Sequence, residues 1–353
     1  AFSVAIYDLG AKRALLAVDR LGIRPLCLAP IDNGIVFGAT ADSVIAHPGV
    51  ARRIDPQSLY DYLYFHMIPS PRTIYQRVEK LLPGQCALLE SGRIQKRFYW
   101  QMEYRDTNDT PQEQLAEEFR GLLRKTVRRA LNRPATKIGN FLSGGTASST
   151  LAGIVTEVTG APAETYSIGF DAEGFDESRY ADIAVKHFGT RHHNYYVTPQ
   201  DVVDTIPLIA RAYDEPFGNA SAVPTYYCAK MANADGVDLM IAGDGGDELF
   251  GGNVRYVKQK TFELYSRLPA PLRRAFIEPL ALHMPGAKNI AVLRKLQSYI
   301  AQAKIPLPDR LESYNFLHRT PSHDIFQGSF LEMIDLEEPL DNMREVYRRA
   351  RAA

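Results

Sequence analysis

The sequence lacks a long apolar run, an excess of charge of either sign, and any regular cysteine pattern. No apolar run approaches the roughly 20 residues that span a bilayer, so no membrane-spanning helix is expected. The 41 Lys and Arg residues balance 41 Asp and Glu residues, which removes the electrostatic reason to expect nucleic acid or an anionic membrane as a partner. Cys27, Cys86 and Cys228 lie far apart without metal-type spacing. They predict a reduced, intracellular protein, and we expect it in the cytoplasm.

The first residues also lack the features of a targeting segment. The chain opens at Ala1 without a methionine, already inside a strand-like run, and no basic stretch precedes an apolar one. We expect no signal peptide, and we expect the true N-terminus to lie elsewhere. The 353 residues, 45% of them apolar, predict a globular protein of about two domains with a substantial core.

Residues 1 to 105 are predicted to form a β-rich domain of short strands and turns. Strand-like runs occupy residues 2–7, 15–18, 34–38 and 85–89. A helix is predicted to follow Asp55 and to run from Pro56 through Leu63, because proline suits the first helical position after an acidic cap. Residues 101–112 are polar and turn-rich, so we place the domain boundary there and start the second domain, 113–353, beyond it.

The second domain shows alternating strand and helix patterns. The predicted strands are residues 138–142, 165–170, 192–197 and 237–242, and helical patterns lie between them, as at 148–157 and 223–233. Such alternation predicts an α/β fold with a doubly wound, mainly parallel sheet. Ligands of these sheets bind at the carboxyl ends of the strands.

The segment 141–149, Phe-Leu-Ser-Gly-Gly-Thr-Ala-Ser-Ser, lies where a predicted strand meets a predicted helix. Glycines allow the backbone to approach an oxyanion closely, and serine hydroxyls and a helix N-terminus donate hydrogen bonds to it. The pattern predicts a phosphate-binding loop. The alternative is a tight serine- and glycine-rich turn that caps the helix.

The segment 243–252, Gly-Asp-Gly-Gly-Asp-Glu-Leu-Phe-Gly-Gly, follows another predicted strand. Its acids Asp244, Asp247 and Glu248 would repel one another without a cation. Carboxylate oxygens suit Mg²⁺, which usually also binds substrate phosphate oxygens. The alternative, an acidic surface loop, fits less well with the apolar strand before it and the glycines around it.

A third polar segment, residues 213–225, joins two predicted helices. It contains Asp214, Glu215, Asn219 and hydroxyl residues, and we interpret it as a source of substrate contacts. Because many surface loops are polar, the pattern alone is equally compatible with an ordinary loop.

In this order, the three segments resemble the synthetase domain of the asparagine synthase (glutamine-hydrolysing) family. That family has a strand ending in Ser-Gly-Gly-x-Asp-Ser, a later Asp-Glu-Pro loop, and the Gly-Asp-Gly-Gly-Asp-Glu-x-Phe-Gly-Gly signature that residues 243–252 reproduce. Residues 166–170 resemble the family's second strand. Upstream, residues 19–26, 46–50, 69–74, 82–85 and 98–100 resemble the second half of its N-terminal-nucleophile glutaminase domain.

The resemblance implies an adenine nucleotide alpha-hydrolase-like (PP-loop) fold behind a partial glutaminase domain. It implies an enzyme that adenylates a carboxylate with ATP, releases pyrophosphate, and amidates the acyl-adenylate with ammonia from glutamine. Aspartate, giving asparagine, is the default acceptor; a sugar acid, a peptide carboxylate or a β-amino acid are alternatives. A further alternative is a relative without catalytic activity that only binds nucleotide or acts as a scaffold. The resemblance leaves open whether the protein forms a homodimer.

The resemblance also implies roles for individual residues. Ser143, Gly144, Gly145 and Ser148 would hold pyrophosphate, while Phe141, Ile168 and Gly243 would meet the nucleotide. Asp247 would bind magnesium, and Asp247 and Glu248 would form the catalytic pair.

The sequence departs from the family's pattern at Ala147, where the family has an aspartate that binds Mg²⁺ opposite Asp247. Engineering and natural decay are both open as explanations. None of the three cysteines matches the family's N-terminal nucleophile, and its C-terminal lysine has no counterpart. We therefore expect a fragment cut at both ends, without glutaminase activity and with an incomplete β-rich layer that tends to associate.

Overall fold

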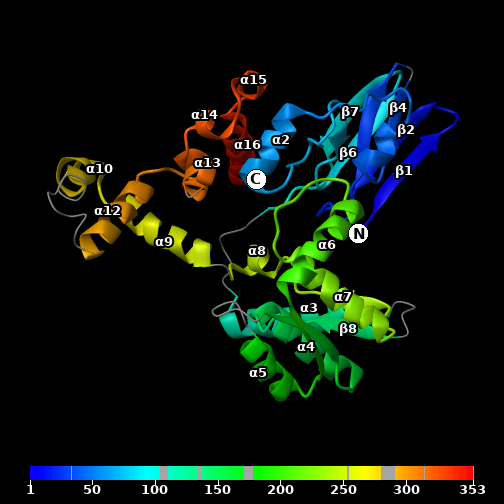
Figure 1. Ribbon diagram of the computed structural model, residues 1–353, viewed down its shortest axis with the longest axis vertical. Helices are drawn as coiled ribbons and strands as arrows, with labels where there is room; N and C mark the ends of the chain where they lie inside the picture. The colour runs from blue at the N-terminus through cyan, green and yellow to red at the C-terminus, as the bar shows by residue number, and fades with distance from the viewer. Residues whose placement is uncertain are drawn as a thin grey trace. The chain divides into compact units, whose positions relative to one another are not determined.

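The computed structural model describes residues 1–32, 34–103, 110–132, 137–170, 178–252, 254–279, 291–313 and 315–352 (Figure 1). The chain packs into two compact units. Unit 1 comprises Ala1–Arg105, Tyr213–Gly218 and Phe262–Ala353, and unit 2 comprises Asp106–Ala212 and Asn219–Thr261. The division of the sequence into domains 1–105 and 113–353 stays a prediction, and its boundary falls partly on residues 104–109, outside the described residues.

The β-rich part of unit 1 consists of two small antiparallel sheets. One has the order β1 (Ser3–Asp8), β2 (Arg13–Val18), β6 (Gln85–Glu90), β7 (Arg93–Phe98), and the other the order β4 (Gly34–Gly38), β3 (Cys27–Ile31), β5 (Glu79–Lys80). Leu16, Val18 and Ala87 of the first sheet form one core cluster with Leu28 of the second. Strand β7 escapes sequence prediction because four of its six residues are charged or amide side chains.

Helices complete unit 1, beginning with α1 (Ala41–Ile45) and α2 (Pro56–Phe65). Helix α2 starts at Pro56 as predicted, and its Tyr60 and Tyr64 bury their rings with Leu340 of α16 (Glu338–Ala352). The intervening described elements are the part of α9 (Val254–Ser266) from Phe262 on, α10 (Ala270–Leu272), η1 (Arg273–Ile277), α12 (Ala291–Ala303), η3 (Asp309–Glu312), α13 (Phe316–Arg319), α14 (Ser322–Ile325) and α15 (Gly328–Leu331).

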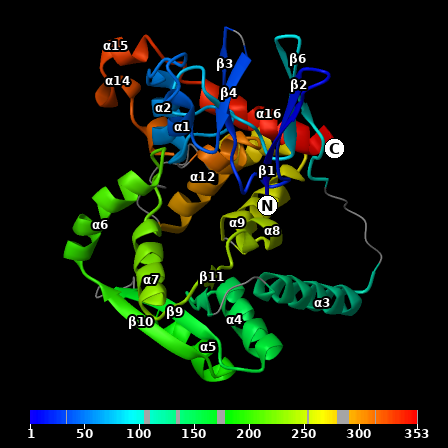
Figure 2. The ribbon, with the colours of Figure 1, turned by 90° about the vertical axis from the view of Figure 1, so that its right-hand side faces the viewer.

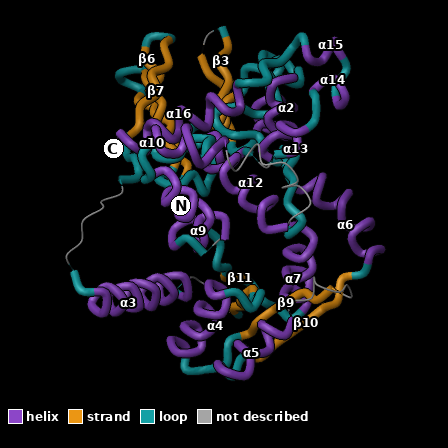
Figure 3. The backbone as a smooth tube through the Cα atoms, turned by 90° about the vertical axis from the view of Figure 1, so that its left-hand side faces the viewer, coloured by secondary structure: helices purple, strands orange, loops and turns teal. Residues whose placement is uncertain are grey.

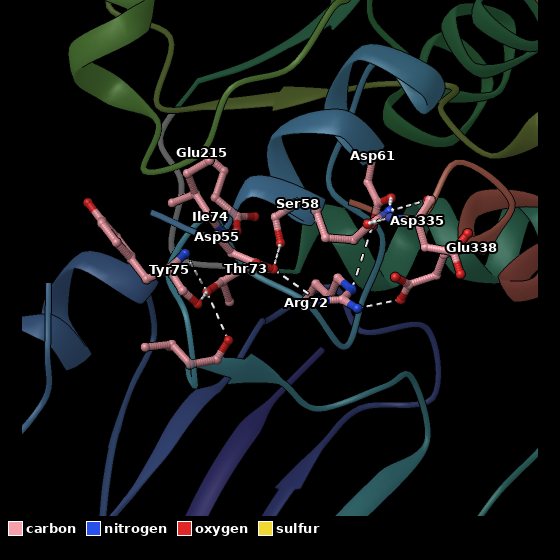
Figure 4. A network of polar contacts seen from close by, with 12 residues as sticks. Asp55, Ser58, Asp61, Arg72, Thr73, Ile74, Tyr75, Glu215, Asp335 and Glu338 are labelled. Atoms are coloured by element: carbon pink, nitrogen blue, oxygen red, sulfur yellow. Dashed lines mark hydrogen bonds and ion pairs between the residues drawn. The ribbon is translucent and has the colours of Figure 1, made fainter. Parts of the chain in front are cut away.

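A polar network joins α2 to the start of α16 (Figure 4). The Arg72 guanidinium lies 2.9 Å from Asp55 Oδ2 and also pairs with the Glu338 carboxylate. Gln57 donates from Nε2 to the backbone oxygen of Asp335 (3.1 Å) and accepts from that residue's backbone nitrogen (2.7 Å). These hydrogen bonds and this ion pair therefore hold together segments of unit 1 that lie about 270 residues apart in the sequence.

Within the described residues, unit 2 is built on a four-stranded sheet whose strands are all parallel. Its order is β10 (Arg191–Val197), β9 (Glu164–Phe170), β8 (Ile138–Phe141), β11 (Leu239–Ile241). Numbered along the unit, this is the order 3-2-1-4, in which the chain direction across the sheet reverses between β8 and β11. The predicted parallel sheet is confirmed, with each strand within two residues of its predicted start.

Helices cover both faces of the sheet (Figures 2 and 3). Helix α4 (Thr146–Thr159) packs with α5 (Ser178–Phe188) through Ala152 and Ala184, and with α3 (Gln112–Leu131) through Val155 and Val127. On the other face, α6 (Pro199–Ala212) and α7 (Ala222–Ala234) pack on β9 and β10 around Tyr227. The doubly wound α/β class is therefore confirmed.

The remaining sequence observations concern cysteines and membrane spans. All three cysteines are buried and free of disulfides, and burial raises the thiol pKa of Cys27 and of Cys228 to about 12. Such thiols are poor nucleophiles at neutral pH. Within the described residues, no helix combines the length and apolarity that a bilayer crossing requires.

Candidate functional site

Two of the predicted loops leave neighbouring strands of the unit 2 sheet at the same end. Strand β8 runs directly into the 142–148 loop, and β11, its parallel neighbour, runs into the 242–246 loop. This is the point at which the strand order reverses, where the loops on either side diverge and leave a crevice in doubly wound sheets.

The first loop is held in shape by its two serines. Ser148 Oγ accepts a hydrogen bond from the Ser143 backbone nitrogen (3.2 Å) and donates to the Gly145 carbonyl oxygen (3.2 Å). The two serine hydroxyl oxygens are 3.0 Å apart. Ser148 is buried whereas Ser143 is exposed, so the first fixes the loop and the second faces solvent.

Gly144 is required by the geometry of this loop. Its φ of +79° lies in the left-handed region. A Cβ at this position would also lie 2.5 Å from the Ala181 backbone nitrogen and 2.6 Å from the Tyr180 carbonyl carbon. Both atoms are backbone atoms of α5, which cannot rotate away as a side chain could. The loop therefore lies so close to α5 that a side chain at position 144 would displace either the loop or the helix.

Helix α4 begins immediately after Gly145, which adopts an extended conformation and caps the helix without a side-chain hydrogen bond. The first backbone N–H groups of a helix have no partner within the helix. In a helix of 14 residues they coincide with the positive end of the dipole. Together with the serine hydroxyls, this end of α4 forms a cradle that suits an anion such as phosphate.

The second loop lies directly against the first. A Cβ on Gly243 would be 3.0 Å from Ala147 Cβ and 3.2 Å from the Ser148 backbone nitrogen, and a Cβ on Gly246 would be 3.2 Å from Ala147 Cβ. The short helix α8 (Gly246–Phe250) then starts after Gly245, whose φ is +85°. Its first turn carries Asp247 and Glu248, both exposed. The expectation that the two loops lie side by side is confirmed.

Ala147 occupies the contact between the loops, and its Cβ faces Gly243 and Gly246. A carboxylate at this position would enter the second loop, next to the turn that carries Asp247. Alanine contributes no oxygen, and the described residues contain no group of three or more His, Cys, Asp or Glu side chains that could hold a metal ion. The residues present therefore do not make the two-carboxylate magnesium site that the family pattern implies.

Phe141 and Ile168, predicted to meet the nucleotide, lie on adjacent strands on the face that α7 covers. Both are half-buried and pack against the cluster around Tyr166 and Cys228. The strands are tied at their ends by the Leu142 backbone nitrogen, which donates to the Tyr166 carbonyl oxygen (2.9 Å). Their roles in binding, like those of the other site residues, stay predictions.

The third segment is divided between the two units. Residues 213–218 belong to unit 1, and the carboxylates of Asp214 and Glu215 bind groups of that unit. Lys80, the partner of Glu215, was missed by sequence reasoning because it lies in the run Val78–Leu81, which carries no motif. The contribution of the loop to substrate contacts stays a prediction.

Comparisons with known proteins agree with this geometry. Residues 118–346 match the family described as Asparagine synthase, and residues 1–100 match the one described as Glutamine amidotransferase domain.

Three relatives illustrate the range of similarity. A Putative asparagine synthetase [glutamine-hydrolyzing] 2 of Methanocaldococcus jannaschii is 32% identical over 83% of this chain and 58% of its own length. An Asparagine synthetase [glutamine-hydrolyzing] 1 of Bacillus subtilis is 28% identical over 82% of this chain and 46% of its own. An Amidase chry2 of Gibberella zeae is 24% identical over 71% and 39%, respectively.

This chain thus spans about half the length of the curated relatives that it matches. The matched region holds both loops and the sheet that carries them, and it covers well over half of the chain. The chain therefore belongs to the asparagine synthase family.

Proposed function

We propose that the protein to which these residues belong is a glutamine-dependent amidotransferase that activates a carboxylate with ATP. The observation that carries this proposal is the contact between the 142–148 and 242–246 loops at the strand-order reversal, where one phosphate chain can reach both. The matches to a synthase family and to a glutamine amidotransferase domain support the same reaction class.

In the proposed reaction, a carboxylate oxygen of the acceptor attacks the α-phosphorus of ATP. The bond between the α-phosphorus and the bridging oxygen breaks, and pyrophosphate leaves with the electron pair. Ammonia then attacks the acyl carbon, loses a proton, and expels AMP. Ser143, Gly144, Gly145 and Ser148 would hold the departing pyrophosphate by hydroxyl and backbone N–H donors.

The nucleoside end of ATP would lie toward the strand ends that carry Phe141, Ile168 and Gly243. Asp247 and Glu248 are the proposed catalytic acids, and Asp247 the proposed magnesium ligand. A bound magnesium ion would supply positive charge to the separating phosphates. Since Ala147 offers no second carboxylate, we assign no step to the metal in this chain.

Aspartate is our default acceptor, in line with the names of several relatives. A sugar acid, a peptide carboxylate or a β-amino acid remain alternatives, and one relative carries the different name amidase. A second candidate function, nucleotide binding without turnover, is favoured by one specific observation: Ala147 interrupts an otherwise intact pair of loops.

Substitution of Ser148 by alanine is expected to weaken ATP binding about tenfold. The change removes a hydroxyl that accepts from Ser143 and donates to Gly145, and each such bond contributes about 0.5–1.5 kcal/mol to holding the loop in shape. Isothermal titration with ATP measures the effect, and Ser149→Ala on the next residue of α4 is the matched control. Equal affinity of Ser148→Ala and the unaltered chain would contradict the phosphate-loop assignment.

We also propose a reducing, cytoplasmic setting, to which three buried free thiols are suited.

The substrates proposed here are small molecules, and a second copy of the chain is the proposed macromolecular partner. Strand β1 is an edge of its sheet and exposes Ile6 and Tyr7. Exposed apolar edge strands promote pairing between chains. Sedimentation velocity is expected to show a weight-average mass that grows with concentration, and a monomer throughout the micromolar range would contradict it.

A further inference from the structure

The chain leaves unit 2 at the end of α6, contributes six residues to unit 1, and returns to unit 2 before α7. These six residues, Tyr213–Gly218, are called the anchor segment below. Ordering the backbone of such a segment costs conformational entropy, which its contacts within unit 1 must offset. Both acids of the segment make polar contacts with unit 1.

Asp214 binds the backbone at the start of α1. Its Oδ2 accepts a hydrogen bond from the Ala41 backbone nitrogen at 2.9 Å. Ala41 is fully buried, so its N–H group depends on this carboxylate in place of water. Thr40, the residue before Ala41, is the N-cap of α1, and its side chain accepts a hydrogen bond from the Ser43 backbone nitrogen.

Glu215 makes two contacts, one with each carboxylate oxygen. Oε1 accepts from the Ile74 backbone nitrogen at 3.1 Å, and Oε2 lies 2.5 Å from Lys80 Nζ. Lys80 also donates to the Ile68 carbonyl oxygen at 3.1 Å. The side chains of Lys80 and Glu215 are 14% and 17% exposed, so the pair is well shielded from solvent. Ion pairs in such surroundings are screened much less than pairs on the surface.

The end of the anchor segment is fixed as well. The Gly218 backbone nitrogen donates to the His66 carbonyl oxygen at 2.7 Å, and a Cβ on Gly218 would lie 3.0 Å from His66 Cβ. From Ile74, the contacts continue through its carbonyl oxygen to the Asp55 backbone nitrogen (2.9 Å), and from Asp55 to Arg72. The anchor segment therefore joins the same polar network that holds α16.

We propose that Asp214 and Glu215 are positioning residues that anchor the 213–218 segment to unit 1, and that they are not ligands of the acceptor. In the chain that follows the segment directly, Asn219, Ser221 and Thr225 are exposed at the start of α7. These three side chains are the acceptor-facing candidates of the segment. Their proposed role rests on the proposed function, whereas the anchoring does not.

Amide hydrogen exchange resolved by NMR tests the anchor directly, because the Ala41 and Ile74 amides donate to the two carboxylates. In Glu215→Ala, exchange at Ile74 is expected to accelerate about tenfold or more, and Asp214→Ala should do the same at Ala41. Exchange in residues 219–225 should accelerate in both variants. Glu332→Ala, which removes an exposed carboxylate of the same unit, is the control and should change none of these amides.

Conservative variants separate anchoring from a general loss of stability. Glu215→Gln keeps an oxygen that can accept from Ile74, so exchange there should stay within about threefold of the unaltered chain, although the ion pair with Lys80 is lost. Lys80→Met also removes the ion pair but leaves Glu215 Oε1 able to accept from Ile74, so exchange there should likewise stay within about threefold. Unchanged exchange at Ala41 and Ile74 in Asp214→Ala/Glu215→Ala would overturn the anchor.

A separate titration with ATP distinguishes this proposal from the proposed function. ATP affinity should be unchanged in Glu215→Gln, because the carboxylate serves unit 1 and not the phosphate loop. Weaker ATP binding by Glu215→Gln with normal exchange at Ile74 would overturn the anchor and return the acid to the substrate site. If instead Ser148→Ala leaves ATP binding unaltered while the exchange results hold, the proposed function fails and the anchor stands.

Discussion

Replacing Ala147 by aspartate is expected to make ATP binding by this chain depend much more strongly on magnesium. The methyl group of Ala147 faces Gly243 and Gly246 across the contact between the two loops, so a carboxylate there would enter the turn that carries Asp247. It would supply a hard oxygen ligand and a negative charge, which are the features that Mg²⁺ requires. Removing a group that merely hydrogen-bonds to a metal ligand lowers metal affinity about 10–100-fold. Restoring a ligand itself should therefore increase the effect of magnesium on ATP affinity by at least ~10-fold.

The measurement is isothermal titration of ATP with and without magnesium, and the quantity compared is the ratio of the two dissociation constants within each variant. This ratio removes the general stabilisation, about 0.3–1 kcal/mol, that an acid brings to the first turn of any helix. Ala147→Asn, with nearly the same shape but no charge, is the matched control and should lie close to the unaltered chain. Equal ratios in Ala147→Asp and Ala147→Asn would show that position 147 binds no metal, and would favour a structural turn at residues 143–148.

The second large effect is expected at Asp61, where asparagine should stabilise unit 1 at pH 7.5. Asp61 is fully buried on α2, and its Oδ2 has no hydrogen-bond partner within the described residues. Burial, opposed by the Gln57 hydrogen bond and assisted by the Glu338 carboxylate, raises the pKa of Asp61 from 3.8 to about 6. Arg72 Nε lies 3.8 Å away and is already engaged with Asp55 and Glu338, so it compensates the buried charge only in part.

The pH dependence follows from the direction of this shift. Because the pKa is higher in the folded protein, the folded state binds the proton more tightly than the unfolded state. The resulting stabilisation is fully present below about pH 4 and is lost as the pH rises through about 6. A rise of this size corresponds to about 3 kcal/mol. Asp61→Asn should therefore equal the unaltered chain near pH 4 and exceed it by up to about 3 kcal/mol at pH 7.5.

Denaturant titrations of Asp61→Asn and of the unaltered chain at several pH values measure this difference in the free energy of unfolding. Asp55→Asn is the control, because Asp55 also pairs with Arg72. Asp55 Oδ2 accepts from both Arg72 (2.9 Å) and Ser58 (2.7 Å), so its replacement should destabilise the protein at pH 7.5. Opposite signs for the two substitutions would establish that burial dominates at Asp61 and pairing at Asp55. Destabilisation by Asp61→Asn at pH 7.5 would mean that its attraction to Arg72 outweighs the burial of the charge.

The fold class and the turn at residues 143–148 could be predicted from the sequence because their signals are local. Alternating strand and helix patterns predicted β8, β9, β10 and β11, and the glycines and serines of 143–148 predicted the turn between β8 and α4. The conformation of such a turn depends on residues within a few positions of one another, as the left-handed Gly144 illustrates. Strand β7 was missed for the same reason, since its charged sequence lacks a local apolar pattern.

Long-range packing brings some of these local features together and keeps others apart. The placement of β11 beside β8, which brings Gly243 against Ala147, depends on pairing between strands about 100 residues apart. The acids of the anchor segment looked like ligands in the sequence, but their partners Ala41, Ile74 and Lys80 lie 135–173 residues away. The local sequence was enough to predict the helices and strands of unit 2 and the chemical groups that its loops carry. Their partners were decided by long-range packing, because a charge or N–H group is satisfied by whatever lies near it in space, and no local periodicity records that neighbour.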